Sequence, residues 1–134
     1  MSDYHKNYSQ DEQIYPKIKD EILTNERRDE NVYLDNVKKM VEQLIGPRKE
    51  DISSSQLRNV FSRVRKMKEP KELYLLRPKL AYIYGRPNSK DGMKKLIIIL
   101  DELIPKVDNK DKLEKFKSFF EAIIAYHKFY GGSN

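Results

Sequence analysis

Apolar residues recur at intervals of three and four along most of this chain, which is the period of a helix buried on one side. The first clear block runs from about Asn31 to Ile45 and carries Val37, Val41 and Leu44 on one face. Gly46 and Pro47 follow it, and this pair is typical of a helix end. The spacing therefore predicts a first helix over residues 31–45.

Two further blocks follow the same logic. Ser53, Ser54 and Ser55 offer N-cap oxygens, and the apolar arc after them predicts a second helix that extends to about Met67. A third helix is predicted from Pro70 to just before Gly85, because proline suits the first turn of a helix. Pro78 lies inside this third block and should kink or divide it near residues 75–77.

The last two blocks are the most apolar. A fourth helix is predicted from about Ser89 to Ile104, and Ile98 and Ile99 lie off its main apolar face. Such a helix is either central in a bundle or covered by another subunit. A fifth helix is predicted from Lys110 to Tyr130. No block shows a strand period, so the expected fold is all-α: a compact bundle of about five helices with short loops.

Residues 1–30 show no sustained period and are predicted to form a flexible N-terminal arm. The alternative is a short helix formed against a partner, because Ile14, Ile18 and Ile22 are spaced by four. The expected organisation is thus an arm over residues 1–30 and a single helical-bundle domain over residues 31–132. A length of 134 residues agrees with one domain.

Composition excludes several classes of protein. The chain has no Cys, which excludes a disulfide framework, a thiolate zinc site and a cysteine nucleophile. The first residues are polar and lack the apolar segment of a secretory signal. The longest aliphatic run, Leu96–Leu100, is too short to span a bilayer. We therefore expect a cytoplasmic protein with no membrane partner.

The net charge is concentrated in the middle of the chain. Residues 52–95 hold 12 Lys or Arg and 3 acidic residues, a local net charge of +9 within an overall +6. The second predicted helix has no acidic residue at all. A cationic field of this kind favours binding of a polyanion, most often a phosphate backbone. The alternative is an ordinary solvated surface.

The predicted contact residues lie in the second and third helices and the loop after them. They are Gln56, Arg58, Asn59, Arg63, Arg65, Lys66, Arg77, Lys79 and Arg86. Arginine suits phosphate because its planar fork donates two parallel hydrogen bonds. Arg77 has a second interpretation, since it lies beside the apolar arc and could pair with a helix end or an internal carboxylate. No recognition helix for reading bases is evident, so the pattern favours sequence-independent backbone contacts.

Catalytic signatures are lacking. His5 falls in the predicted arm, and His127 falls on the apolar arc of the last helix, where a packed core histidine is more typical than a catalyst. No His or Glu spacing suits a metal, and no glycine-rich loop suits a nucleotide. We expect no enzyme activity, no metal and no cofactor.

Three segments in order carry a resemblance to a known family: SSSQLRNVFSRVRKM (53–67), LRPKLAYIYGRP (76–87) and FFEAIIAYHKFYGG (119–132). Together they resemble the small helical subunit of the Csm complex, the type III-A CRISPR effector. The similarity extends over about residues 32–132 and leaves out the predicted arm.

The resemblance implies a cytoplasmic, RNA-guided antiviral ribonucleoprotein in which this subunit is helical and non-catalytic. It implies guide RNA, target RNA and other Csm subunits as partners, and self-association of several copies along the complex. It assigns the basic residues of 56–66 and 77–86 to RNA. It also makes Ile98, Ile99 and the region 126–130 candidates for subunit contacts. The alternative is a helical protein–protein interaction module that binds no nucleic acid.

Overall fold

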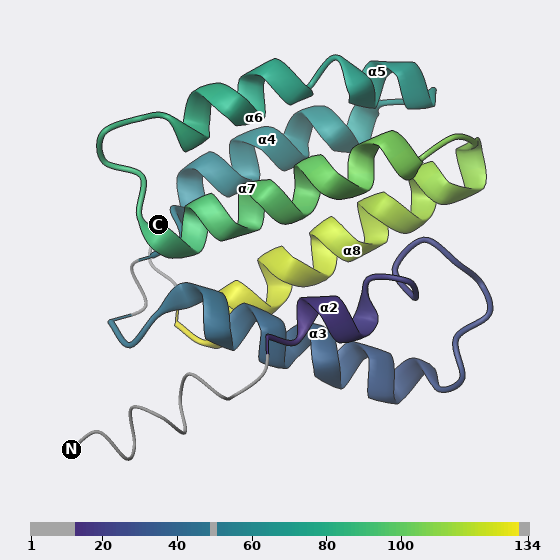
Figure 1. Cartoon of the computed structure of the whole chain (residues 1–134), viewed down its shortest axis with the longest axis horizontal. Helices are drawn as coiled ribbons and strands as arrows, with labels where there is room; N and C mark the ends of the chain where they lie inside the picture. The colour runs from purple at the N-terminus through teal and green to yellow at the C-terminus, as the bar shows by residue number, and fades with distance from the viewer. Residues whose placement is uncertain (1–12, 49–50, 132–134) are drawn as a thin grey trace.

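The computed structural model describes residues 13–48 and 51–131, and these residues contain helices and no strand. The elements are α2 (Tyr15–Ile18), α3 (Glu30–Ile45), α4 (Ser54–Lys66), α5 (Pro70–Tyr74), α6 (Arg77–Tyr84), α7 (Asp91–Leu103), the 3₁₀ turn η1 (Ile104–Lys106) and α8 (Lys110–Phe129). The predicted all-α bundle is confirmed (Figure 1).

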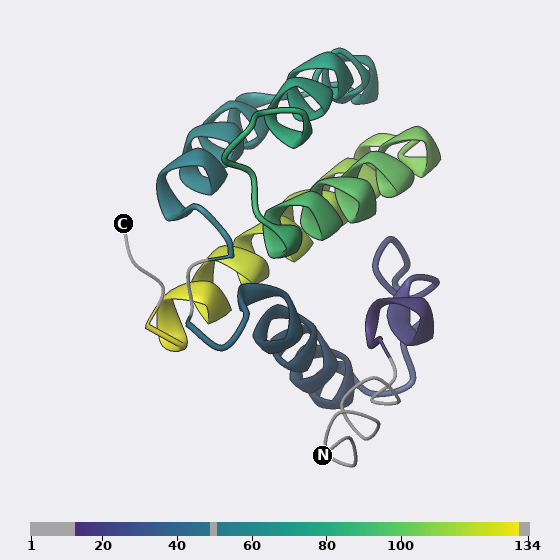
Figure 2. The ribbon, with the colours of Figure 1, turned by 60° about the vertical axis from the view of Figure 1, so that its left-hand side comes forward.

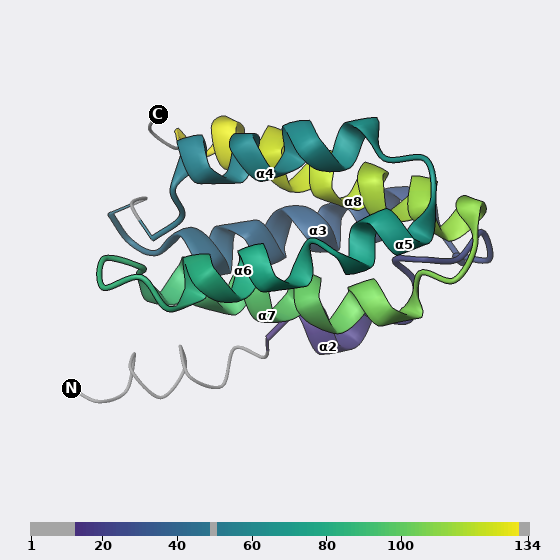
Figure 3. The same ribbon diagram turned by 90° about the horizontal axis from the view of Figure 1, so that it is seen from above.

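The helices form three tiers, which Figure 2 shows in cross-section. Helices α7 and α8 form the central tier. Helix α3 contacts both of them from one side, and α2 packs beside α3. On the other side α4 packs on α8 and α6 packs on α7. Helices α4 and α6 run in opposite directions along this face (Figure 1, Figure 3). Because both pack on the central tier from the same side, their outer surfaces face the same side of the molecule.

Capping side chains set the helix starts. The Asp29 carboxylate accepts from the backbone N–H groups of Asn31 and Val32 at 2.9 and 3.2 Å. Ser53 Oγ accepts from the Gln56 N–H at 3.2 Å, as the serine cluster predicts. Each contact satisfies a donor that the first helical turn leaves free.

The third predicted helix is divided, as Pro78 predicts. Helix α5 ends at Tyr74 and α6 begins at Arg77, with Pro78 in its first turn. Proline cannot donate to the preceding turn, so the helical hydrogen bonds are interrupted here. The break leaves Leu75 outside both helices, and Leu73 and Leu76 are buried on either side of it.

Helix α7 is central, which explains its apolar character. Ile97 lies toward α6, where it contributes to the lining of a small gap with Leu80 and Ile83. Ile99 lies toward α3, beside Met40 and Leu44. Of the two expectations for this helix, the central position in the bundle is the one observed, although Ile98 remains 54 % exposed.

Two glycines allow close approach where α3 ends. Gly46 follows α3 with φ of 78°, a conformation that other residues rarely adopt. Gly92 lies in the first turn of α7 against the end of α3, where an added Cβ would be 1.8 Å from the Leu44 carbonyl oxygen. The backbones of α3 and α7 therefore meet without a side chain between them.

The predicted boundary at residue 30 needs a correction for residues 13–29. Ile18 and Ile22 are 1 % and 0 % exposed and belong to the core. The Ile14 N–H donates to Gln43 Oε1 at 3.1 Å, and Tyr15 OH donates to Glu102 Oε1 at 2.8 Å. The isoleucine spacing did indicate a short helix, and this helix, α2, packs on α3 of the same chain. Residues 1–12 of the predicted arm, with His5, lie outside the described residues.

Candidate nucleic-acid interface

The site is built on the outer face of α4. Leu57, Val60 and Val64 are buried against the central tier, and Phe61 packs on Phe120 of α8 with ring centroids 5.2 Å apart. The opposite side of the helix is polar and cationic because the chain has no acidic residue between Ile52 and Lys68. The exposed members of the predicted set on this helix are Arg58, Asn59, Arg63, Arg65 and Lys66.

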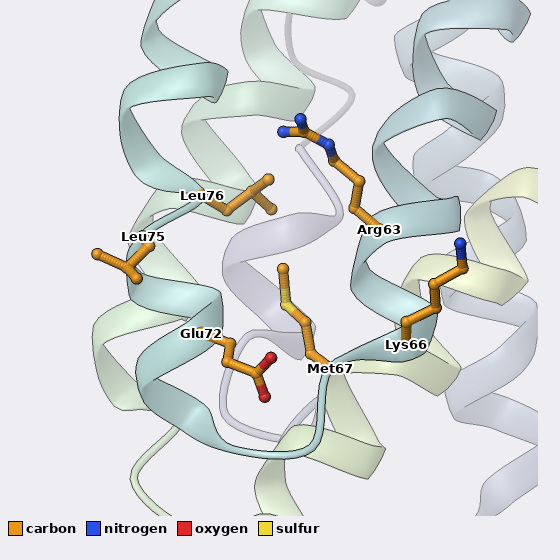
Figure 4. Close-up of a pocket in the computed structure, with 6 residues that line it drawn as sticks. All are labelled: Arg63, Lys66, Met67, Glu72, Leu75 and Leu76. Atoms are coloured by element: carbon orange, nitrogen blue, oxygen red, sulfur yellow. The ribbon is translucent and has the colours of Figure 1, made fainter.

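The cations lie on two flanks of α4, as their spacing predicts. Arg58 lies on the α8 flank, where it is close enough to His127 to lower the pKa of that residue. Arg65 is seven residues further along and so lies on the same flank. Arg63 points toward α5 into an open groove between the two helices, and Lys66 contributes to the rim of that groove while its ammonium group points away from α5 (Figure 4). A strand lying across α4 could therefore contact cations on both sides of the helix axis.

These cations have no acidic partner within residues 13–48 and 51–131. Arg58, Arg63, Arg65 and Lys66 form no ion pair there. Two carboxylates that follow α4 in the chain are engaged elsewhere: Glu69 pairs with Lys110 at 3.4 Å, and Glu72 Oε1 accepts from the N–H groups of Lys68 and Glu69 at 2.8 and 2.9 Å. On α8, Glu114 pairs with Lys117 at 3.3 Å. The positive potential of the α4 face is therefore not cancelled locally.

Arg77 is paired internally. Its Nε donates to Asp101 Oδ1 at 2.7 Å and its Nη2 donates to Asp101 Oδ2 at 3.2 Å, which ties α6 to α7. The carboxylate raises the pKa of Arg77 through this hydrogen bond and through charge attraction. Of the two sequence-based interpretations, the internal carboxylate is the one that the structure contains.

The remaining predicted residues lie around α4 and α6. Gln56 is half-buried in the first turn of α4, and Lys79 is half-buried on α6. Arg86 is exposed just after the end of α6, where its N–H donates to the Ile83 carbonyl at 3.3 Å. The structure thus places six of the nine predicted residues on α4, two on α6, and Arg86 just after the end of α6.

Sequence reasoning missed two parts of this surface. Lys117 of α8 donates from Nζ to the backbone carbonyls of Arg65 and Met67, at 3.3 and 2.6 Å, where α4 ends. Leu76 and Met67 point into the groove beside Arg63, whereas Leu75 points away from it (Figure 4). The only sequence signal for the groove was the presence of Leu73, Leu75 and Leu76 just before Pro78, since one buried helix face cannot hold all three.

His127 is a core residue, as its position on the apolar arc predicts. It is 2 % exposed, and burial lowers its pKa, while a hydrogen bond with the Ile52 backbone opposes that shift. Its Nε2 atom is buried and has no hydrogen-bond partner among the described residues. No group of three His, Asp or Glu side chains within the described ranges could hold a metal ion.

The fold and the site define an all-helical protein that presents an unneutralised cationic helix on one face. Residues 33–133 match the family model described as Csm2 Type III-A. The chain belongs to this family, and its partners are other subunits of the type III-A CRISPR Csm complex. No curated protein and no solved structure matches it. Across residues 13–48 and 51–131, no helix has the length and apolar content that crossing a membrane requires.

Proposed function

We propose that this protein is a non-catalytic, RNA-binding subunit of the Csm complex that helps to hold target RNA paired to guide RNA. The observation that carries the proposal is the set of cations on α4 that form no ion pair with the described residues. Arg58, Arg63, Arg65 and Lys66 share one exposed helix face, and guanidinium groups bind phosphate in two-point geometry. Contacts of this kind fix a strand without reading its sequence.

Arg77 has a separate role in this proposal. Two of its five N–H donors are held by Asp101, so in this proposal it serves the α6–α7 contact and is not part of the RNA-contacting set. The RNA-contacting set is then the α4 residues, with Lys79 and Arg86 extending the surface along α6.

The subunit contacts are proposed to use surfaces away from the cations of α4. Ile98 is exposed between two shallow grooves, one lined by Ala81 and Tyr84 and the other by Tyr15 and Pro16. Near the end of α8, Phe129 is 65 % exposed, and the Lys38 ammonium lies 4.2 Å from its ring centroid. Both surfaces suit self-association and contacts with other Csm subunits.

The decisive experiment reverses two cations. The double variant Arg58→Glu with Arg63→Glu should lower the affinity for a short single-stranded RNA at least about tenfold at low salt, and it should make the logarithm of affinity depend less steeply on salt. The matched control is Arg28→Glu with Lys39→Glu, which makes the same charge change at two exposed positions. Arg28 lies just before α3 and Lys39 lies on α3, on the opposite side of the central tier from α4. Wild-type affinity in the α4 double variant would refute the proposal.

A second readout addresses target RNA directly. In a reconstituted Csm complex, the α4 double variant should speed the release of target RNA while guide RNA remains bound. An unchanged release rate would remove the role in holding the target strand.

A helical interaction module without nucleic-acid binding is the second candidate function, and the exposed Ile98 favours it. Sedimentation at several protein concentrations, with and without RNA, separates the two functions. This second function would be supported if self-association did not depend on RNA or on salt concentration and the α4 double variant kept wild-type RNA affinity.

A further inference from the structure

The outer side of α7 carries a charge pattern that reverses its sign about Ile98. Residues 94–102 read KKLIIILDE, so two lysines lie three and four residues before Ile98, and two carboxylates lie three and four residues after it. Residues three and four apart share one face of a helix. This face of α7 therefore has a positive end, an apolar centre and a negative end.

The face is open in the folded chain, although α7 is the central helix. Ile98 is 54 % exposed, and Lys95 and Glu102 on either side of it are exposed as well. Figure 3 shows α2 and α7 along one edge of the molecule and α4 along the opposite edge. The outer face of α7 is therefore separate from the cations of α4.

Ile98 stands between two shallow grooves. Ala81 and Tyr84 of α6 line one of them, and Tyr15 and Pro16 of α2 line the other. An exposed apolar side chain of this kind gains free energy when another surface covers it. A helix that lies across α7 could cover Ile98 and place its own apolar side chain in one of the grooves.

The charges on the α2 flank have no ion partner within the part of the chain that the structure describes. Lys95 and Glu102 both lie on this flank, and Glu102 Oε1 accepts from Tyr15 OH at 2.8 Å. Neither of the two forms an ion pair. On the α6 flank, by contrast, Asp101 already binds Arg77. Lys95 and Glu102 are thus the charges that a partner would match.

We propose that α7 packs antiparallel against α7 of a second copy of this chain, with Ile98 close to the two-fold axis. In this arrangement Lys95 of each copy lies opposite Glu102 of the other, whereas a parallel arrangement would oppose like charges. The interface uses the same patch twice, so it closes at two chains. The inference rests on the self-association named in the proposed function, and it adds the surface and the symmetry.

A second copy fits this face better than RNA or an unrelated protein does. A phosphate backbone would meet Asp101 and Glu102 at one end of the face, where like charges repel it. An unrelated partner would not require the order of charges to reverse about a single residue. Pairing of the face with itself does require that order, because each end then meets its opposite.

The first test measures sedimentation of the full chain at several concentrations. Lys95→Glu places carboxylates opposite each other, so it should raise the dissociation constant of the dimer at least about tenfold, and Glu102→Lys should do the same. The combined variant Lys95→Glu with Glu102→Lys inverts the pattern and should restore the constant to within about threefold of wild type. The matched control is Lys39→Glu at an exposed position of α3, which should leave it unchanged.

The second test reports the symmetry. The chain has no Cys, so Ile98→Cys introduces a single thiol. Close to a two-fold axis the thiols of two copies meet, and mild oxidation should link the chains into a covalent dimer. Val32→Cys is the control, because Val32 is 55 % exposed on α3 and should give little covalent dimer. A head-to-tail contact through the same face would keep the Ile98→Cys thiols apart.

The inference is overturned if wild-type protein stays monomeric at every concentration, or if the combined charge variant fails to restore the dimer. It is also overturned if Ile98→Cys cross-links no more than Val32→Cys. If Lys95→Glu releases another Csm subunit from the complex while wild-type protein alone is monomeric, the face is a contact with that subunit and the inference fails.

RNA binding separates this inference from the proposed function. Lys95→Glu and Glu102→Lys should bind short single-stranded RNA with wild-type affinity, and the α4 double variant should still form the dimer. Loss of RNA binding in the α4 double variant, without any dimer in wild-type protein, would leave the proposed function standing and refute only the α7 interface.

Discussion

Arg77 and Asp101 form a two-point ion pair between neighbouring helices, with Nε to Oδ1 at 2.7 Å and Nη2 to Oδ2 at 3.2 Å. Both side chains remain nearly half exposed. Ion pairs of this exposure add little stability, but a two-point pair does fix the relative position of two helices. The pair therefore accounts for a basic residue that the charge pattern alone would assign to RNA.

Replacement of Arg77 should therefore affect stability slightly and RNA binding hardly at all. We expect Arg77→Gln to lower the melting temperature by a small amount, because it removes a largely solvated pair. A double-mutant cycle with Asp101→Asn should show coupling between the two residues. Filter binding should give near wild-type RNA affinity for Arg77→Gln, and a loss as large as that of Arg63→Gln would contradict this assignment.

Gly92 should be intolerant of any side chain. Gly92→Ala would place Cβ 1.8 Å from the Leu44 carbonyl oxygen, so α3 and α7 would have to separate. We expect a loss of roughly 2–4 kcal/mol in the free energy of unfolding, measured by urea denaturation. The control is Gly85→Ala, where the nearest atom is 3.6 Å from the added Cβ. Equal stability of the two variants would show that α3 and α7 can move apart freely.

The buried histidine predicts an acid-sensitive fold. Burial lowers the pKa of His127, so the folded state binds its proton less readily than the unfolded state, whose pKa is about 6.5. This stabilisation is complete above pH 6.5 and is lost as the pH falls below it. Protonation would also place a charge near Arg58 and Lys128, which already disfavour it.

Thermal melts across pH 5 to 8 measure this effect directly. Wild-type protein should lose stability as the pH falls through about 6.5, and His127→Leu should flatten that part of the curve. His5→Gln is the matched control, because it removes the only other histidine. An identical pH profile for His127→Leu and wild type would mean that carboxylates alone cause the loss.

Arg27 should hold the segment before α3 in place. Its Nε and Nη2 donate to the carbonyls of Glu21 and Ile22 at 2.6 and 2.9 Å, and its guanidinium lies 3.9 Å from the Tyr33 ring centroid. Arg27→Ala should cost about 1–3 kcal/mol, because these carbonyls lose charged donors in a partly buried site.

Hydrogen exchange gives the readout for this segment. The amides of Ile18 and Ile22 should exchange faster in Arg27→Ala, while those of α8 change less, because the opening is local. Arg28→Ala is the control, since Arg28 is exposed and forms no ion pair with the described residues. Slow exchange of both isoleucine amides in Arg27→Ala would show that burial alone holds the segment.

Helix positions could be predicted well because the signals are local. The apolar period, the serine cluster before α4 and Pro78 between α5 and α6 each act within a few residues of the feature they set. The cations of α4 were predictable for the same reason. They lie on one helix, and helical geometry alone determines which side chains share its outer face.

The features that sequence reasoning missed all depend on contacts between distant segments. The burial of Ile18 and Ile22 depends on cover from α3, which no periodicity within 15–22 reveals. The partner of Arg77 lies 24 residues away on another helix. The groove between α4 and α5 exists only because α5 lies across from the end of α4, and no local pattern indicates that position.

The ammonium group of Lys117 lies at the end of α4, next to the surface that the proposed function assigns to RNA. The last carbonyls of a helix carry partial negative charge, which would repel phosphate next to the arginines. Lys117 donates to the carbonyls of Arg65 and Met67 and so covers that pole with a cation from α8. Because Lys117 also pairs with Glu114 at 3.3 Å, it offsets only part of that negative end, and its main effect is to tie the last turn of α4 to α8.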